Sequence, residues 1–123
     1  MTVIFMDDDA EYRDLAQIWL NTRGVEAIMC KDGHEAVHAL VKHPEVEAAI
    51  LDVMGEKLAD EGVWTARALT AIKPELRVVL ISSGPRPVQD FLFAQKPYDI
   101  DRVLRIIAIG EGSVHDMKIN EDR

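Results

Sequence analysis

The sequence has a single cysteine and no long apolar run. Because Cys30 has no partner of its own kind, an internal disulfide and a zinc site built on several thiolates are both excluded, which fits a reducing compartment. No stretch approaches the roughly 18 apolar residues that a membrane-spanning helix requires. No charged leader followed by an apolar segment opens the chain either. We therefore expect a soluble, cytoplasmic protein with no membrane partner.

Basic residues are also in short supply. The 123 residues include 14 Lys and Arg against 22 Asp and Glu, which gives a formal net charge of −8. The basic residues are scattered along the chain, whereas binding to nucleic acid draws on clustered Lys and Arg. We expect no nucleic-acid partner. The informative acidic residues are those that stand where a strand should be apolar.

Short apolar runs, by contrast, are plentiful, and the hydrophobic content of 48% is ample for the core of one domain. The runs alternate with segments of helical period, which predicts repeated strand-helix units around a parallel sheet. Most runs are continuous rather than alternating, as is typical of strands covered on both faces. The predicted strands are residues 3–6, 27–30, 48–51, 78–81 and 91–94.

Apolar stripes predict four helices. The first runs from Tyr12 to Trp19 and closes near Gly24, the second lies between the Asp32-Gly33 turn and Pro44, the third spans about 60–72, and the last covers 100–107.

The connection between the fourth and fifth strands differs from the others. Residues 83–90 are few and include two prolines, so we expect a loop or one turn instead of a helix. We expect one domain over residues 1–110. Residues 111–123 are polar and lack a stripe, which is typical of a frayed helix end or a disordered tail.

Acidic residues follow two of the predicted strands. Asp7, Asp8 and Asp9 come directly after the first apolar run, and Asp52 comes directly after the third. Because the carboxyl ends of parallel strands meet at one edge of a sheet, we expect these side chains to converge there. One of the first three acids is expected to cap the following helix. Clustered carboxylates repel one another unless a hard cation neutralises them, and Mg²⁺ fits best.

Two further polar side chains belong to the same edge. Lys96 follows the fifth run, and Ser82 ends the fourth. Ser83 competes with Ser82, because side chains alternate along a strand and only one of the two can face the site. The spacing from the fourth run favours Ser82.

These motifs together resemble the signature of the response-regulator receiver domains, the CheY-like family. The likeness covers about residues 2–109. It implies a flavodoxin-like, doubly wound sheet of five parallel strands in the order 2-1-3-4-5 with helices on both faces. It also implies a bacterial phosphoprotein of a two-component system or phosphorelay, which is not an enzyme in the ordinary sense. The motifs are Met6-Asp7-Asp8-Asp9, Leu51-Asp52-Val53-Met54, Ile81-Ser82-Ser83 and Lys96-Pro97-Tyr98.

The resemblance implies a role for each acidic residue. Asp52 would accept a phosphoryl group from the phosphohistidine of a sensor histidine kinase or a histidine phosphotransfer protein. Asp8 and Asp52 would bind Mg²⁺ directly, together with the backbone carbonyl of Met54. Asp7 would hold a water molecule of the metal.

The resemblance also implies how the phosphoryl group is recognised. Lys96 would pair with one of its oxygens, and Ser82 would donate a hydrogen bond to another. In this family the inward movement of the hydroxyl is coupled to an aromatic residue on the fifth strand, here Phe93. The Lys96-Pro97 bond would be cis.

Two departures from the family pattern concern the output. The loop 55–62 lacks the family's proline and is slightly longer, and Ser82 lies closer to Lys96 than is typical, in keeping with a missing fourth helix. That helix helps to form the family's usual output face, so another surface would have to contact the downstream protein target. No DNA-binding output domain is expected.

Two alternatives remain open from the sequence. The first is a small Mg²⁺-dependent phosphohydrolase of the haloacid-dehalogenase type, because Asp7-Asp8-Asp9 contains the DxD spacing, although Glu11 departs from that pattern. The second is a protein-binding module that keeps the acidic residues but works without phosphorylation.

Overall fold

The computed structural model describes residues 1–53 and 55–110, with the backbone alone for 55–60. The strands are β1 (Thr2–Met6), β2 (Glu26–Cys30), β3 (Ala48–Asp52), β4 (Arg77–Ser82) and β5 (Leu92–Gln95). The helices are α1 (Ala10–Asn21), α2 (Gly33–Lys42), α3 (Gly55–Ile72) and α4 (Ile100–Ile109). The expected domain therefore contains every described element, and residues 111–123 lie outside the described part.

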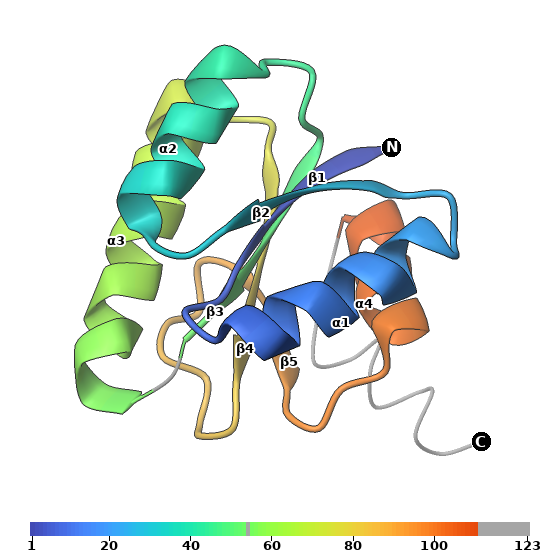
Figure 1. Cartoon of the computed structure of the whole chain (residues 1–123). Coiled ribbons are helices and arrows are strands. Elements are labelled where there is room, and N and C mark those ends of the chain that lie inside the picture. Colours follow the sequence, from blue (N-terminus) through green and yellow to red (C-terminus); the bar gives the residue numbers. More distant parts are fainter. Residues whose placement is uncertain (54, 111–123) are drawn as a thin grey trace.

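The five strands form one parallel sheet in the order β2-β1-β3-β4-β5, which confirms the predicted topology (Figure 1). The helices α2 and α3 cover one face, and α1 and α4 cover the other. All five residues of β3 are buried, as expected for a central strand between two helical layers. Neighbouring residues of a strand supply opposite cores: Ile4 packs on the α2 and α3 side, and Phe5 packs on the α1 and α4 side.

Local chemistry explains where α1 and α4 begin and end. Asp9 caps α1 and Asp99 caps α4, each accepting backbone N–H groups of the first turn. Gly24, just beyond α1, and Gly110, at the end of α4, have positive φ angles of 74° and 76°, a conformation that glycine adopts without strain. Arg77 at the start of β4 donates to two of the last carbonyls of α4, so the helix end is tied to the sheet.

The third helix differs from the prediction. It begins at Gly55, not near residue 60, so residues 55–62, which we expected to form a loop, are helical. The physical reason lies in the sequence Glu-Lys-Leu-Ala at 56–59, whose members all have high helix propensity, with no proline to interrupt them. No strand bound differs from the prediction by more than one residue.

The β4–β5 connection contains no helix, which confirms the expected loop. One side chain organises it: the guanidinium of Arg86 donates to the backbone carbonyls of Val88, Gln89 and Phe91. These bonds satisfy carbonyl groups that a helix would otherwise pair internally. The chain therefore passes from β4 to β5 by a short path.

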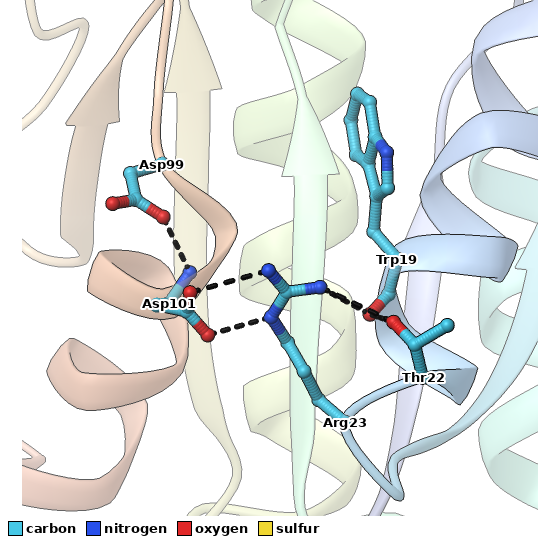
Figure 2. Close-up of polar contacts among 5 residues, drawn as sticks. All are labelled: Trp19, Thr22, Arg23, Asp99 and Asp101. Carbon is cyan, nitrogen blue, oxygen red and sulfur yellow. Dashed lines mark hydrogen bonds and ion pairs between the residues drawn. The ribbon is translucent and has the colours of Figure 1, made fainter.

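An ion pair joins the two helices on the α1 and α4 face. Figure 2 shows the guanidinium of Arg23, just after α1, against the carboxylate of Asp101 in α4, with Nε–Oδ1 2.6 Å and Nη2–Oδ2 3.2 Å. Arg23 also donates to the carbonyl of Trp19. Hydrogen bonding to Arg23 lowers the pKa of Asp101. Both side chains are exposed, so the pair contributes little to the stability of the fold. None of the helices within the described part has the length and apolar character needed to cross a membrane.

Candidate functional site

The sheet delivers the acidic residues to one edge, at the carboxyl ends of β1 and β3. The N–H of Asp7 continues the β1–β2 ladder by donating to the carbonyl of Cys30 at 3.0 Å. Asp52 is the last residue of β3 and lies in register with Ile81. The N–H of Val53 then donates to the carbonyl of Ile81 at 2.7 Å. Backbone hydrogen bonds therefore hold both acids at the carboxyl ends of their strands. In open parallel sheets this edge is where ligands bind.

Three carboxylates converge at this edge, as the sequence predicts. One oxygen from each of Asp7, Asp8 and Asp52 lies within 4.8 Å of the others. Asp7 and Asp52 are buried, with 1% and 5% of their surface exposed, whereas Asp8 is open to solvent. Asp9 turns away and caps α1 through the N–H groups of Glu11 and Tyr12. The acids thus divide into a cluster of three and a helix cap.

Lys96 directly follows the edge strand β5 and reaches the same cluster. Its Nζ lies 3.0 Å from Oδ2 and 2.9 Å from Oδ1 of Asp52. Its backbone N–H donates to the carbonyl of Ser82 at 2.8 Å, which anchors the start of the turn. The peptide bond from Lys96 to Pro97 is cis, as expected. The ammonium of Lys96 therefore contacts Asp52, the central acid of the cluster.

The surroundings of Asp52 disfavour its charged form. Burial is the largest cause, followed by the neighbouring carboxyl of Asp7, and the ammonium of Lys96 opposes both. Together they raise the pKa of Asp52 to about 7. Any further positive charge placed beside Asp52 would stabilise its charged form.

The residues fit a divalent cation. Oδ2 of Asp7 is buried and has no hydrogen-bond partner within the described part of the chain, although Oδ1 accepts the N–H of Asp9 at 2.9 Å. An unsatisfied buried oxygen beside two other carboxylates is the ligand set of a hard, oxygen-seeking ion. Mg²⁺ suits it, because that ion binds few carboxylates and keeps room for water and phosphoryl oxygens. Met54, whose carbonyl the sequence reading adds to this set, lies outside the described residues.

The two adjacent serines differ in environment. Ser82 ends β4, is 8% exposed, and its Oγ accepts the N–H of Gly84 at 3.0 Å. Ser83 lies beyond the strand and is exposed. Phe93 is partly buried against the core on the α2 and α3 side. The roles expected of Ser82 and Phe93 thus stay predictions.

Two residues of the site were missed by the sequence reading. Tyr12, expected to belong to the apolar stripe of α1, places its ring centroid 4.9 Å from Nζ of Lys96. Arg13 donates from Nη1 to the backbone carbonyl of Asp7 at 2.7 Å. The signal for Tyr12 was its place one turn after the acids, but helical periodicity alone assigns an aromatic at that position to the core.

Comparison with known proteins bears on the fold. No protein-family model and no curated protein sequence matches the chain. The receiver domain of the hybrid histidine kinase CckA is 22% identical with a TM-score of 0.72, covering 89% of this chain and 98% of that one. A response regulator receiver protein from Sinorhizobium medicae WSM419 is 18% identical with a TM-score of 0.74, covering 89% and 93%. The signal receiver domain of a modulated diguanylate cyclase from Desulfovibrio desulfuricans G20 is 23% identical with a TM-score of 0.73, covering 97% of each. The chain therefore has the CheY-like fold of response-regulator receiver domains.

Proposed function

We propose that the chain is the phosphoacceptor of a two-component system or phosphorelay, and that Asp52 receives the phosphoryl group. The observation that carries the proposal is the convergence on Asp52 of two more carboxylates and one ammonium, at distances that suit a bound cation and a phosphoryl group. The CheY-like fold supports it. The donor would be the phosphohistidine of a sensor histidine kinase or of a histidine phosphotransfer protein. The reaction would take place in the cytoplasm.

In the proposed reaction an Oδ atom of Asp52 attacks phosphorus, and the bond from phosphorus to the imidazole nitrogen breaks. The electron pair of that bond stays on the imidazole, which takes up a proton from solvent. A divalent cation held by Asp8 and Asp52, with Asp7 holding one of its water molecules, would supply positive charge to the phosphoryl oxygens. Lys96 would turn from the carboxylate to one of these oxygens, and Ser82 would donate its hydroxyl to another. The protein's contribution is thus positioning and charge.

The direct test is acetyl phosphate with Mg²⁺, followed by intact mass. We expect the wild type to gain one phosphoryl group, which is lost again in alkali, and Asp52→Asn to gain none. Asp14→Asn, a change at an exposed acid on α1, is the matched control and should behave as wild type. Equal labelling of Asp52→Asn would contradict the proposal.

The same preparations separate the alternatives. Steady turnover of phosphomonoesters that depends on Asp7 and survives Asp52→Asn would identify a haloacid-dehalogenase-type hydrolase. A protein target bound equally well with and without Mg²⁺ and phosphorylation would identify a phosphorylation-independent binding module. We expect instead that binding of the downstream target changes when beryllofluoride occupies Asp52, through the coupled movement proposed for Ser82 and Phe93.

A further inference from the structure

We propose that Tyr12 is a positioning residue, whose ring holds the ammonium of Lys96 at the phosphoacceptor. The inference rests on the proposed function and adds a residue to the site. Nζ of Lys96 lies 4.9 Å from the ring centroid of Tyr12 while it contacts both carboxylate oxygens of Asp52. The ammonium is therefore bound between an anion and an aromatic ring. The Lys96 side chain is only 16% exposed, so little water weakens either attraction.

The ring of Tyr12 is itself held in place. It stacks on Phe5 of β1 at 6.4 Å between centroids, and makes T-shaped contacts with Trp19 and Tyr98 at centroid distances of 5.9 and 6.3 Å. These partners come from the sheet, from the next turns of α1 and from the turn that follows Lys96. Such a cluster leaves a tyrosine ring few orientations. Tyr12 therefore offers Lys96 a fixed surface instead of a mobile one.

The position of Tyr12 follows from the helix cap. Oδ1 of Asp9 accepts the N–H of Tyr12, so the turn that carries the acids to the sheet edge also places the ring beside Lys96. Tyr12 and the acids at 7–9 thus belong to the segment from β1 into α1, whereas Lys96 and Tyr98 belong to the turn between β5 and α4. The contact joins the two segments that must stay in register for the site to form.

The chemical need for a second partner arises during the reaction. Before phosphorylation the carboxylate of Asp52 attracts the ammonium directly. Once one oxygen of Asp52 is bonded to phosphorus, that carboxylate charge is gone, and Lys96 must pair with a phosphoryl oxygen instead. A lysine side chain has many rotamers and would otherwise explore solvent. Attraction to the ring does not depend on the charge of Asp52, and it tolerates a small shift of the ammonium over the ring face.

The kinetic test compares Tyr12→Phe, which keeps the ring, with Tyr12→Leu, which removes it. We expect the rate constant for phosphorylation by acetyl phosphate to fall about 3- to 30-fold in Tyr12→Leu and less than about 2-fold in Tyr12→Phe. Trp19→Leu is the matched control, because Trp19 belongs to the aromatic cluster but makes no cation–π contact with Lys96 among the described residues. It should lose clearly less rate than Tyr12→Leu, because Tyr12 keeps its contacts with Phe5, Tyr98 and Lys96.

Three results would overturn the role: a wild-type rate in Tyr12→Leu, an equal loss in Tyr12→Phe, or an equal loss in Trp19→Leu. The first denies positioning, the second assigns the effect to the hydroxyl, and the third assigns it to the cluster as a whole. Thermal unfolding of each variant identifies any protein that fails to fold.

A spectroscopic arm keeps this inference separate from the proposed function. The ring face of Tyr12 should shift the ε-methylene protons of Lys96 upfield in the NMR spectrum of the wild type. The shift should persist in Tyr12→Phe and disappear in Tyr12→Leu. A wild type without this shift overturns the positioning role even if Asp52 is phosphorylated. A shift in a protein that acetyl phosphate never labels supports the contact and rejects the phosphoacceptor function.

Discussion

At the scale of single residues, the carboxyl group of Asp7 divides its oxygens between two environments. Oδ1 accepts the N–H of Asp9 and holds the turn into α1, whereas Oδ2 is buried without a hydrogen bond from the described residues. One oxygen of Asp7 lies within 4.8 Å of oxygens of Asp8 and Asp52, so the carboxyl group of Asp7 faces other acids. Repulsion between these acids destabilises the metal-free fold, and a cation placed among them would relieve it.

We predict that Asp7→Asn stabilises the metal-free protein. The amide oxygen can still accept the N–H of Asp9, while the amide nitrogen takes the place of Oδ2 and can donate to Asp52. We expect the free energy of unfolding in urea, at pH 8 with a chelator, to rise by about 1–2 kcal/mol.

The same variant should bind Mg²⁺ more weakly, because one negative charge has left the cluster. Asp14→Asn serves again as the control and should change neither quantity. A destabilised Asp7→Asn protein in the chelator would show that the buried oxygen is satisfied in solution.

At the scale of elements, the close approach of α3 to β3 decides how firmly the end of β3 is held. A Cβ added at Gly62 would lie 2.6 Å from Cγ2 of Val53, the residue directly after Asp52. Val53 is buried and branched at Cβ, so it has little freedom to move aside. The absence of a side chain at Gly62 therefore lets the helix pack against the strand end that carries Asp52.

We predict that Gly62→Ala lowers the free energy of unfolding by about 1 kcal/mol, although alanine is the better helix former. Helix propensity alone would favour alanine by ~1 kcal/mol, but overpacking costs ~1–3 kcal/mol. Urea denaturation measures the difference. A control with Val53→Ala in the same chain removes the clashing methyl groups, and there Gly62→Ala should become neutral or stabilising. A stabilised single variant would contradict the close contact.

Elements also show what the sequence could and could not predict. The strand order followed from the family resemblance. The convergence of Asp7, Asp8 and Asp52 with Lys96 followed from which residues stand at strand ends, because parallel strands bring those ends together. The start of α3 was wrong by about five residues, since family resemblance suggested a loop where propensity favours helix. Tyr12 was missed because a periodic pattern reports that a residue faces inward but not which side chain it meets there.

At the scale of the whole molecule, the reactivity of Cys30 depends on whether the protein is folded. It ends β2, is 2% exposed, and packs in the core that β1, β3, β4, α2 and α3 share. Burial raises the pKa of the Cys30 thiol to about 12, and the nearby acids Glu35 and Asp32 add to this. The thiolate, the reactive form, is therefore scarce as long as the protein is folded.

We predict that alkylation of Cys30 at pH 8 is roughly a thousandfold slower in the native protein than in urea, since a pKa near 12 leaves far less thiolate than a value near 9. The raised pKa of Cys30 also makes the folded protein less stable at high pH, because the thiol ionises first in the unfolded chain. The contribution of the neutral thiol is complete below the unfolded pKa and is lost as the pH rises toward 12.

Mass spectrometry of the alkylated protein measures the rate, and unfolding of Cys30→Ala provides the pH control. That variant should lose less stability between pH 9 and 12 than the wild type does. Rapid alkylation of the native chain would show that the β2 edge opens readily.

The short β4–β5 connection has a consequence for how the sheet assembles. Ser82 and Lys96 are joined by a hydrogen bond and by a brief stretch of chain that Arg86 ties together. The entropy lost in closing a loop grows with its length, so β5 can join β4 at smaller cost than a helix-length crossover would impose. Contacts between residues near in sequence also form faster than distant ones. We therefore expect Ser82 and Lys96 to come together early in folding, through local contacts. Asp7 and Asp52 should meet later, when β1 pairs with β3 over a long stretch of sequence.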